Sequence, residues 1–444
     1  MFYFSKFFNI KKIYNMFFFS FFIIININLS LNYIKIPFEK KYKEKITEDN
    51  YIDSLLNSKL ICELEIGTPN QNLPLTLKLN QYPTYISSSQ IKNPNIIKYD
   101  EMKSSSYRKL KNNSEKFDYQ DFSYGIKSID KFYFEKNNKT HQEITFILAT
   151  KLIINETGVL GLDTNFVRHI NLGDTSLLKQ LKANNYINTY AFSFDFNNFN
   201  LIVGGYLSDY DDNYNDEDLI KVTNEIDTTY VKWNLKSQKI FYDNESLFTF
   251  NFGFLEPSIN AIIGTKMFYN KIFDDFFEEY LNNNICHQKI IESYILDEKN
   301  QFLFFYCDKD INVEKFKKLI FIYDRFNFEL GFNELFQMFE KKYYFLIGFY
   351  YKNNQVMDRK WVFGEPFFKK HSIVIDQNKK IIGIYTKKRG NLTSNNILFV
   401  VILVFLIFIA ILLIVYLYKF LRKNKGKRIN KVIENYDYIP NREI

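Results

Sequence analysis

Residues 60–79 read LICELEIGTPNQNLPLTLKL, which is two short runs rich in Leu and Ile joined by the turn-forming letters GTPN. Similar runs of Ile, Phe, Tyr, Val and Leu recur between Asn, Asp and Gly turns, among them TFILAT, TYAFSFDF, LFTFNF, FLFFYC and IIGIY. Short apolar runs bounded by turn residues are typical of antiparallel β-strands. Helical patterns are limited to residues 175–184 and 270–282. The sequence therefore predicts an all-β fold with a few short helices.

The net charge of +8 is concentrated at the two ends of this 444-residue chain. The first 16 residues carry +3 and residues 419–444 carry +5, so the body between them is neutral. A nucleic-acid-binding domain needs a basic excess on its folded body. We therefore expect no nucleic-acid partner. A hydrophobic share of 46% with 24% charged residues also excludes wholesale disorder.

An uncharged apolar run predicts a membrane span near the C-terminus. Residues 397–418 read ILFVVILVFLIFIAILLIVYLY. As a helix they would extend roughly 33 Å, which is enough to cross a hydrocarbon core of about 30 Å. A buried core helix of this length would rarely exclude every polar side chain. The Lys and Arg residues that follow predict a cytoplasmic basic tail, 419–444, in contact with membrane lipids.

The N-terminus has the pattern of a signal peptide, residues 1–30. Lys11 and Lys12 precede the apolar stretch MFFFSFFIIININLS, and a retained anchor is the alternative reading. The charged residues 31–54 are expected to form a short leader or an exposed arm. Together the two ends predict a single-pass type I membrane protein of the secretory pathway or cell surface, with its ectodomain lumenal or extracellular. The expected glycosylation sites are Asn112, Asn138, Asn155, Asn244 and Asn391.

The chain has three cysteines. Cys286 and Cys307 bracket a polar turn within an apolar hairpin-like stretch, so we expect them to pair in an oxidising compartment. Cys62 lies inside the run LICELEI, where we expect it to be buried and inert.

Five stretches together carry a family resemblance. They are GTPNQ at 67–71, DFSYGIKS at 121–128, TGVLGL at 157–162, LIVGG at 201–205 and WVFGEPFFKKHSIVID at 361–376. Their order and spacing resemble the pepsin-like aspartic peptidases over about residues 55–388. The resemblance implies a bilobal all-β fold with an N-terminal lobe at 55–215 and a C-terminal lobe at 216–390, followed by a linker at 391–396 and the transmembrane helix. It also implies a disulfide in the region of Cys286 and Cys307.

In that fold a hydrophobic-hydrophobic-Gly segment runs beside each active-site loop, because only Gly permits so close a backbone approach. Leu160-Gly161 would serve the first loop and Phe363-Gly364 the second. Such a matched pair is not explained by ordinary glycines at strand ends.

The two catalytic aspartates of the family are not found. Counting from Pro69 places the first on Lys78, and no Asp or Glu occurs from Ile66 to Tyr99. The second position is assigned to Asn251, with Gly253 as the glycine of the loop. Neither replacement can complete a pair of carboxylates that shares one proton, because a lysine ammonium has no lone pair and an Asn amide does not titrate.

The sequence thus predicts a pseudoprotease with no catalytic residues, no cofactor and no metal site. By the resemblance, Tyr124 and Gly125 form the tip of the flap that closes over a peptide or protein ligand in the interlobe cleft. The alternative is an active membrane-bound aspartic endopeptidase with divergent active-site loops.

Overall fold

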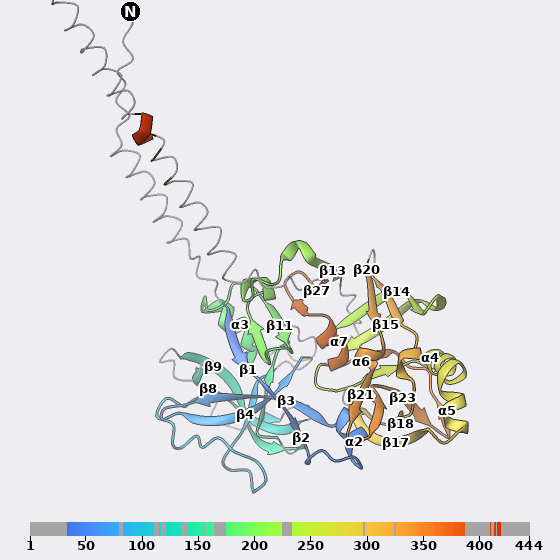
Figure 1. Ribbon diagram of the computed structural model, residues 1–444. Coiled ribbons are helices and arrows are strands. Elements are labelled where there is room, and N and C mark those ends of the chain that lie inside the picture. The colour runs from blue at the N-terminus through green and yellow to red at the C-terminus, as the bar shows by residue number, and fades with distance from the viewer. Residues whose placement is uncertain are drawn as a thin grey trace, which may run out of the picture. The chain divides into compact units, whose positions relative to one another are not determined.

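The computed structural model describes residues 33–79, 83–110, 115–116, 121–134, 141–154, 156–163, 175–223, 233–295, 298–323 and 326–386, with 409, 413 and 415–418 near the C-terminus. Residues through Lys387 make up one compact unit, and residues from Lys388 make up a second. The first unit is predominantly β, as predicted, and contains three sheets (Figure 1).

The first sheet is built from the N-terminal half of the chain, which runs from blue to teal in Figure 1. Its strands are β2 (Glu39–Tyr42), β3 (Ser58–Ile66), β4 (Gln71–Lys78), β5 (Tyr85–Ser87), β6 (Arg108–Lys109), β7 (Glu115–Lys116), β8 (Phe122–Tyr133), β9 (Gln142–Leu152) and β10 (Gly158–Gly161). The opening stretch of the sequence forms the antiparallel pair of β3 and β4, with Ile66 opposite Gln71 across the GTPN turn.

The second sheet is built from the C-terminal half, drawn from yellow-green to orange in Figure 1. Its strands are β14 (Asn234–Tyr242), β15 (Glu245–Leu255), β16 (Ile262–Gly264), β17 (Cys286–Ile295), β18 (Glu298–Asp308), β19 (Leu319–Tyr323), β20 (Phe326–Leu330), β21 (Phe336–Phe339), β22 (Lys342–Phe345), β23 (Ile347–Lys352), β24 (Gln355–Val356) and β25 (Trp361–Phe363). The predicted disulfide between Cys286 and Cys307 is confirmed, and it joins two residues that face each other across β17 and β18.

The third sheet combines strands from both halves in the order β1-β12-β11-β26-β27-β13. They are β1 (Ile34–Pro37), β11 (Ala191–Asp195), β12 (Asn200–Val203), β13 (Leu219–Thr223), β26 (Ile373–Asp376) and β27 (Ile381–Tyr385). The antiparallel pairing of β11 with β26 joins a strand of the N-terminal half to a strand near the C-terminal end of the body.

Residues 33–42 are not an exposed arm, contrary to the sequence-based expectation. β1 pairs with β12 in the third sheet, and β2 pairs with β3 in the first. The charged side chains alternate with apolar ones, and Ile36 and Phe38 are buried. Phe38 packs edge-on against Phe194 and Phe196. The high charge of this segment therefore conceals an apolar face that is part of the core.

The helices are short, and the longer ones fall where the sequence predicts them. They are α2 (Tyr51–Leu56), α3 (Leu177–Ala183), α4 (Lys266–Ile272), α5 (Glu278–Asn282), α6 (Phe332–Leu335) and α7 (Glu365–Lys370), with the π-turn η4 (Phe273–Phe277) between α4 and α5 and the 3₁₀ turns η2 (Leu207–Asp209), η3 (Asp216–Asp218) and η5 (Val313–Lys315). The hydroxyl of Ser176, and not Thr175, caps α3 by accepting from the backbone N–H of Lys179.

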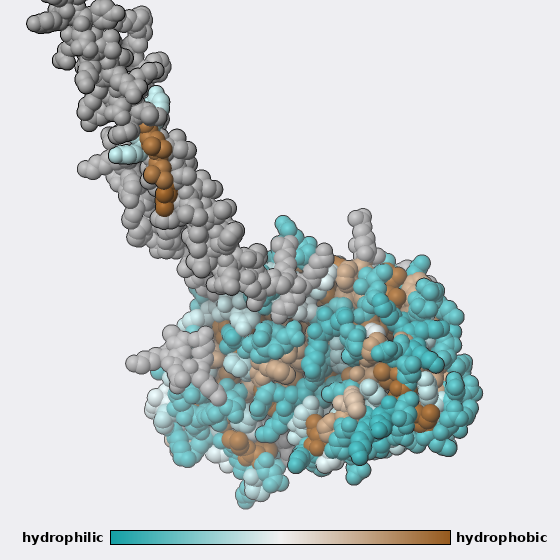
Figure 2. Space-filling view, viewed as in Figure 1, coloured by the Kyte–Doolittle hydropathy of each residue, from teal (hydrophilic) through white to brown (hydrophobic). Residues whose placement is uncertain are grey.

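Aromatic side chains fill much of the core. Phe321 packs edge-on against both Trp361 and Phe363 at centroid distances of 5.1 Å. The surface is mostly hydrophilic on the face drawn in Figure 2, with hydrophobic side chains in separate patches. Such a distribution is ordinary for a folded body in water.

Several predicted features lie wholly or largely outside the described residues. They are the signal peptide, the linker, the tail, Asn112, Asn138, Asn155 and Asn391. Of the predicted span 397–418, only the helical residues 409, 413 and 415–418 are described. No helix within the described part of the chain combines the length and apolar character of a membrane span. Asn244 is exposed in the turn between β14 and β15.

We predict that Gly364→Ala destabilises the body strongly while Gly331→Ala does not. A Cβ at Gly364 would lie 2.1 Å from the carbonyl oxygen of Ala261 and 2.6 Å from that of Ile259, and neither backbone atom can swing away. The nearest atom to a Cβ at Gly331 would be Glu334 Oε2, at 3.6 Å. Urea unfolding should show a loss of about 3 kcal/mol or more at Gly364 and about 1 kcal/mol or less at Gly331. Equal losses would contradict the close packing.

Candidate functional site

The two halves of the body carry matching loops, each with a strand threaded beside it. β10 lies parallel to β4, with Gly161 opposite Lys78. β25 lies parallel to β15, with Leu255 opposite Phe363. The hydrophobic-hydrophobic-Gly prediction is therefore confirmed in both halves, because Leu160-Gly161 and Phe363-Gly364 run beside the two loops.

The strand registers identify the residue that corresponds to Lys78 in the second loop. One step beyond Leu255, the backbone N–H of Glu256 donates to the carbonyl of Phe363 at 2.9 Å, which places Glu256 beside Gly364. A second pairing agrees with this position. Tyr85, seven residues after Lys78, faces Val159, and Ile263, seven residues after Glu256, faces Val362. Val159 precedes Gly161 by two residues, and Val362 precedes Gly364 by two residues. Glu256 therefore holds the position in the second loop that Lys78 holds in the first.

The assignment of Asn251 to the second position is thereby corrected. Asn251 faces Ser237 in the middle of β15, five residues before Glu256. The sequence-based assignment used Gly253 because the family loop has a glycine two residues after its aspartate. Glu256 lacks that glycine, because it is followed by Pro257 and Ser258. Gly364 was the signal in the sequence that could have identified Glu256. The strand that pairs with Trp361–Phe363 must end at the residue beside Gly364, and that residue is Glu256.

Lys78 is held at the end of β4 by two buried carboxylates. Its Nζ lies 3.0 and 3.2 Å from the two carboxylate oxygens of Asp121 and 4.0 Å from Glu156 Oε2. The Asp121 and Glu156 side chains are only 8% and 6% exposed, against 27% for Lys78. The ion pairs connect the end of β4 with the start of β8 and with the turn before β10.

The hydroxyl of Tyr85 completes this cluster. It lies 3.4 Å from Glu156 Oε2 and donates to that carboxylate. Burial, reinforced by the charges of Asp121 and Glu156, raises the pKa of Tyr85, so the hydroxyl keeps its proton. Lys59 adds a second ammonium, half exposed, in contact with Glu156 at 2.5 Å. The first loop therefore ends in a polar cluster in which two acids face two lysines.

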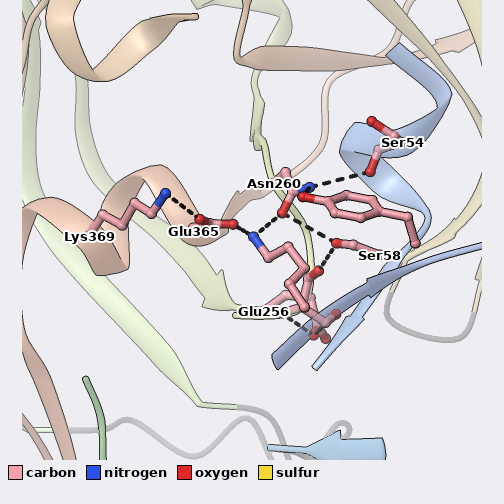
Figure 3. Close-up of polar contacts among 9 residues, drawn as sticks. Ser54, Ser58, Glu256, Asn260, Glu365 and Lys369 are labelled. Carbon is pink, nitrogen blue, oxygen red and sulfur yellow. Dashed lines mark hydrogen bonds and ion pairs between the residues drawn. The ribbon is translucent and has the colours of Figure 1, made fainter. Parts of the chain in front are cut away.

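Glu256 occupies a different environment in the second loop. Its Oε1 accepts a hydrogen bond of 2.6 Å from the Ser258 hydroxyl. Two residues further on, Asn260 meets the N-terminal half: its backbone N–H donates to the carbonyl of Leu55 at 2.7 Å. We call this contact between the second loop and the N-terminal half the seam. Figure 3 shows it, with Glu256 and Asn260 close to Ser54 and Ser58. The second loop is thus fixed against α2 and β3.

Tyr124 and Gly125 lie on a strand and not at a hairpin tip. In β8, Tyr124 faces Lys116 of β7 on one side and Lys151 of β9 on the other, and Gly125 faces Glu115. Tyr124 is 38% exposed, and Lys151 Nζ lies 5.7 Å from the centroid of its ring. The expected tip is corrected because Tyr124 and Gly125 are paired within the sheet, with β7 on one side and β9 on the other.

The matched positions therefore carry one ammonium and one carboxylate. An ammonium that donates to carboxylates cannot accept a proton from water, whereas a carboxylate can accept one. Within the described ranges, no group of three or more His, Cys, Asp or Glu side chains is placed to hold a metal ion. Cys62 is buried, as predicted, and burial raises the pKa of its thiol.

Comparison with known proteins agrees with the fold. The family model of eukaryotic aspartyl proteases matches residues 59–387, which include β3 except for its first residue and all the strands from β4 to β27. A search of curated proteins found no match to the chain.

We predict that Lys78→Met destabilises the body, because it leaves Asp121 and Glu156 buried without their shared cation while keeping the aliphatic length of the side chain. Since Lys78 is partly exposed, the expected loss in the free energy of unfolding is about 1–3 kcal/mol. Lys103→Met is the control, because Lys103 pairs with Asp100 at the surface at the same distance of 3.0 Å. The control should change the free energy by less than about 0.5 kcal/mol. Similar small changes in both variants would show that the Lys78 cluster does not stabilise the loop.

Proposed function

The chain belongs to the eukaryotic aspartyl protease family, and from that membership we propose that it is a non-catalytic, membrane-anchored member that binds extended peptide or protein ligands between its lobes. The observation that carries the proposal is the bidentate contact of Lys78 with Asp121 at the position where the family has its first aspartate.

The chemistry of the family supports this reading. Two carboxylates that share one proton activate a water molecule, one accepting the proton of the water while the other donates to the substrate carbonyl. Lys78 and Glu256 cannot share a proton in that way, because the ammonium is already paired with two acids. Mutual repulsion between two acids, which drives the proton sharing, is absent between an ammonium and a carboxylate.

A ligand-binding role is supported by the strand architecture around Tyr124. Its exposed ring lies beside Lys151, and by resemblance it is the flap tyrosine of the family. An aromatic ring next to an ammonium can pack against an extended peptide that is held by strand-like hydrogen bonds.

Membrane anchoring is proposed from the sequence. The apolar run 397–418, the basic tail 419–444 and the N-terminal signal together support a type I topology, with the body lumenal or extracellular. Glycosylation at Asn244 and at the four other sequons is part of this proposal.

We predict that the purified full-length chain cleaves no member of a random peptide library, at either acidic or neutral pH, in a single-turnover assay read by mass spectrometry. Pepstatin-sensitive cleavage that disappears in Glu256→Gln would establish the alternative, an active membrane-bound aspartic endopeptidase.

For ligand binding, we predict that Tyr124→Ala weakens the affinity for peptides selected from the same library by at least about tenfold. Tyr186→Ala is the matched control, since Tyr186 is 40% exposed and follows α3. The control should bind within about twofold of the unmodified chain. Equal affinity in the chain and in Tyr124→Ala, measured by titration calorimetry, would remove Tyr124 from the binding surface.

A further inference from the structure

A buried lysine, an amide and a carboxylate meet where β2 contacts the C-terminal half. Lys40 of β2 contacts both Asn260 Oδ1 and Glu365 Oε2. The side chains of Lys40 and Glu365 are only 9% and 8% exposed. Figure 3 shows Glu365, at the start of α7, and Asn260, in the second loop, converging on the same ammonium. None of these three residues is used in the function proposed above.

We propose that Lys40 and Asn260 react to form a side-chain amide bond that joins the two halves of the body, with Glu365 as the acid–base group of the reaction. The three groups needed for such a bond are a nucleophilic amine, an acyl group and a proton carrier. The structure places the amine in contact with both of the other groups, in a place from which water is largely excluded.

The atoms of the reaction balance without a further reactant. Lys40 Nζ attacks Cγ of Asn260, and a new C–N bond forms. Glu365 takes a proton from the attacking Nζ and delivers it to Asn260 Nδ2. The bond between Cγ and Nδ2 then breaks, and ammonia leaves. Nothing is oxidised or reduced.

The hydrogen bonds of Asn260 favour this direction. Its Oδ1 lies 3.3 Å from the hydroxyl of Ser58, which can donate to the negative charge that develops on this oxygen. Its Nδ2 donates to the hydroxyl of Tyr42 at 3.2 Å and to the carbonyl of Ser54 at 3.4 Å. The carbonyl oxygen therefore points toward Lys40, while the leaving nitrogen is held on the other side.

Lys40 is also set up as a nucleophile. Burial, with a smaller contribution from the charge of Lys369, lowers the pKa of Lys40 to about 7. A substantial fraction of the amine is then neutral at neutral pH and carries the free electron pair that the attack requires.

Glu365 is a poorer acceptor than Asn260. Its other carboxylate oxygen, Oε1, forms an ion pair with Lys369 Nζ at 2.7 Å. A charged carboxylate resists attack by an amine but accepts and returns protons. This division of roles assigns the acyl group to Asn260.

The test is mass spectrometry of the full-length chain after denaturation, disulfide reduction and tryptic digestion. The expected result is a branched peptide in which Lys40 is joined to Asn260, lighter than its two components by one ammonia, with no cleavage after Lys40. Separate, unmodified Lys40 and Asn260 peptides would overturn the proposal. A branched peptide between Lys40 and Glu365, lighter by one water, would overturn the choice of acceptor.

Variants test the roles of the residues. Lys40→Arg keeps the charge and Glu365→Gln keeps the shape, and both should abolish the branched peptide. Lys41→Arg is the matched control, because Lys41 is on the same strand but exposed, and it should leave the bond intact. If a variant does not fold, the unmodified chain still decides the question. Persistence of the bond in Glu365→Gln would remove Glu365 from the reaction.

Discussion

The close passage of the Phe363-Gly364 backbone beside the second loop is the constraint on which the two-fold plan of the body depends. A side chain at Gly364 would overlap the carbonyl oxygens of Ala261 and Ile259. With the glycine in place, β25 lies between β15 and β16, and Glu365 follows directly at the head of α7. The same arrangement recurs at Gly161 between β4 and β5. Gly364 therefore fixes the position of the second loop and of Glu256, the residue beside it.

The strands, the threaded glycines and Lys78 could be predicted because each is encoded by residues that are close in sequence. Glu256 could not, since its equivalence to Lys78 depends on pairing with Phe363, more than a hundred residues later. The buried role of residues 33–42 was also missed, because their charge density hides an alternation in which Ile36 and Phe38 face inward. The contact of Lys40 with Asn260 and Glu365 follows only from the assembled fold.

The two loops stabilise the charged residue at their matched positions, Lys78 and Glu256, in different ways. At the first, the Lys78 ammonium is surrounded by acids from β8 and from the turn before β10, so the charges balance within the N-terminal half. At the second, Glu256 is held by the neutral hydroxyl of Ser258, and the charges nearby belong to Lys40 and Glu365 across the seam. The net charge of the body is zero. Ion pairs that involve buried side chains contribute to this balance, together with the acidic and basic side chains on the surface.

The seam has a consequence for the order in which the chain can fold. Lys40 and Ser58 meet partners 220 and 202 residues later in the sequence. During synthesis these polar groups cannot make their native contacts until the second loop and α7 have been made, because Asn260 and Glu365 lie there. Contacts between such distant residues carry a large loop-closure entropy and form late. The N-terminal half therefore lacks these native contacts during most of synthesis. They form only when nearly the whole body has emerged from the ribosome.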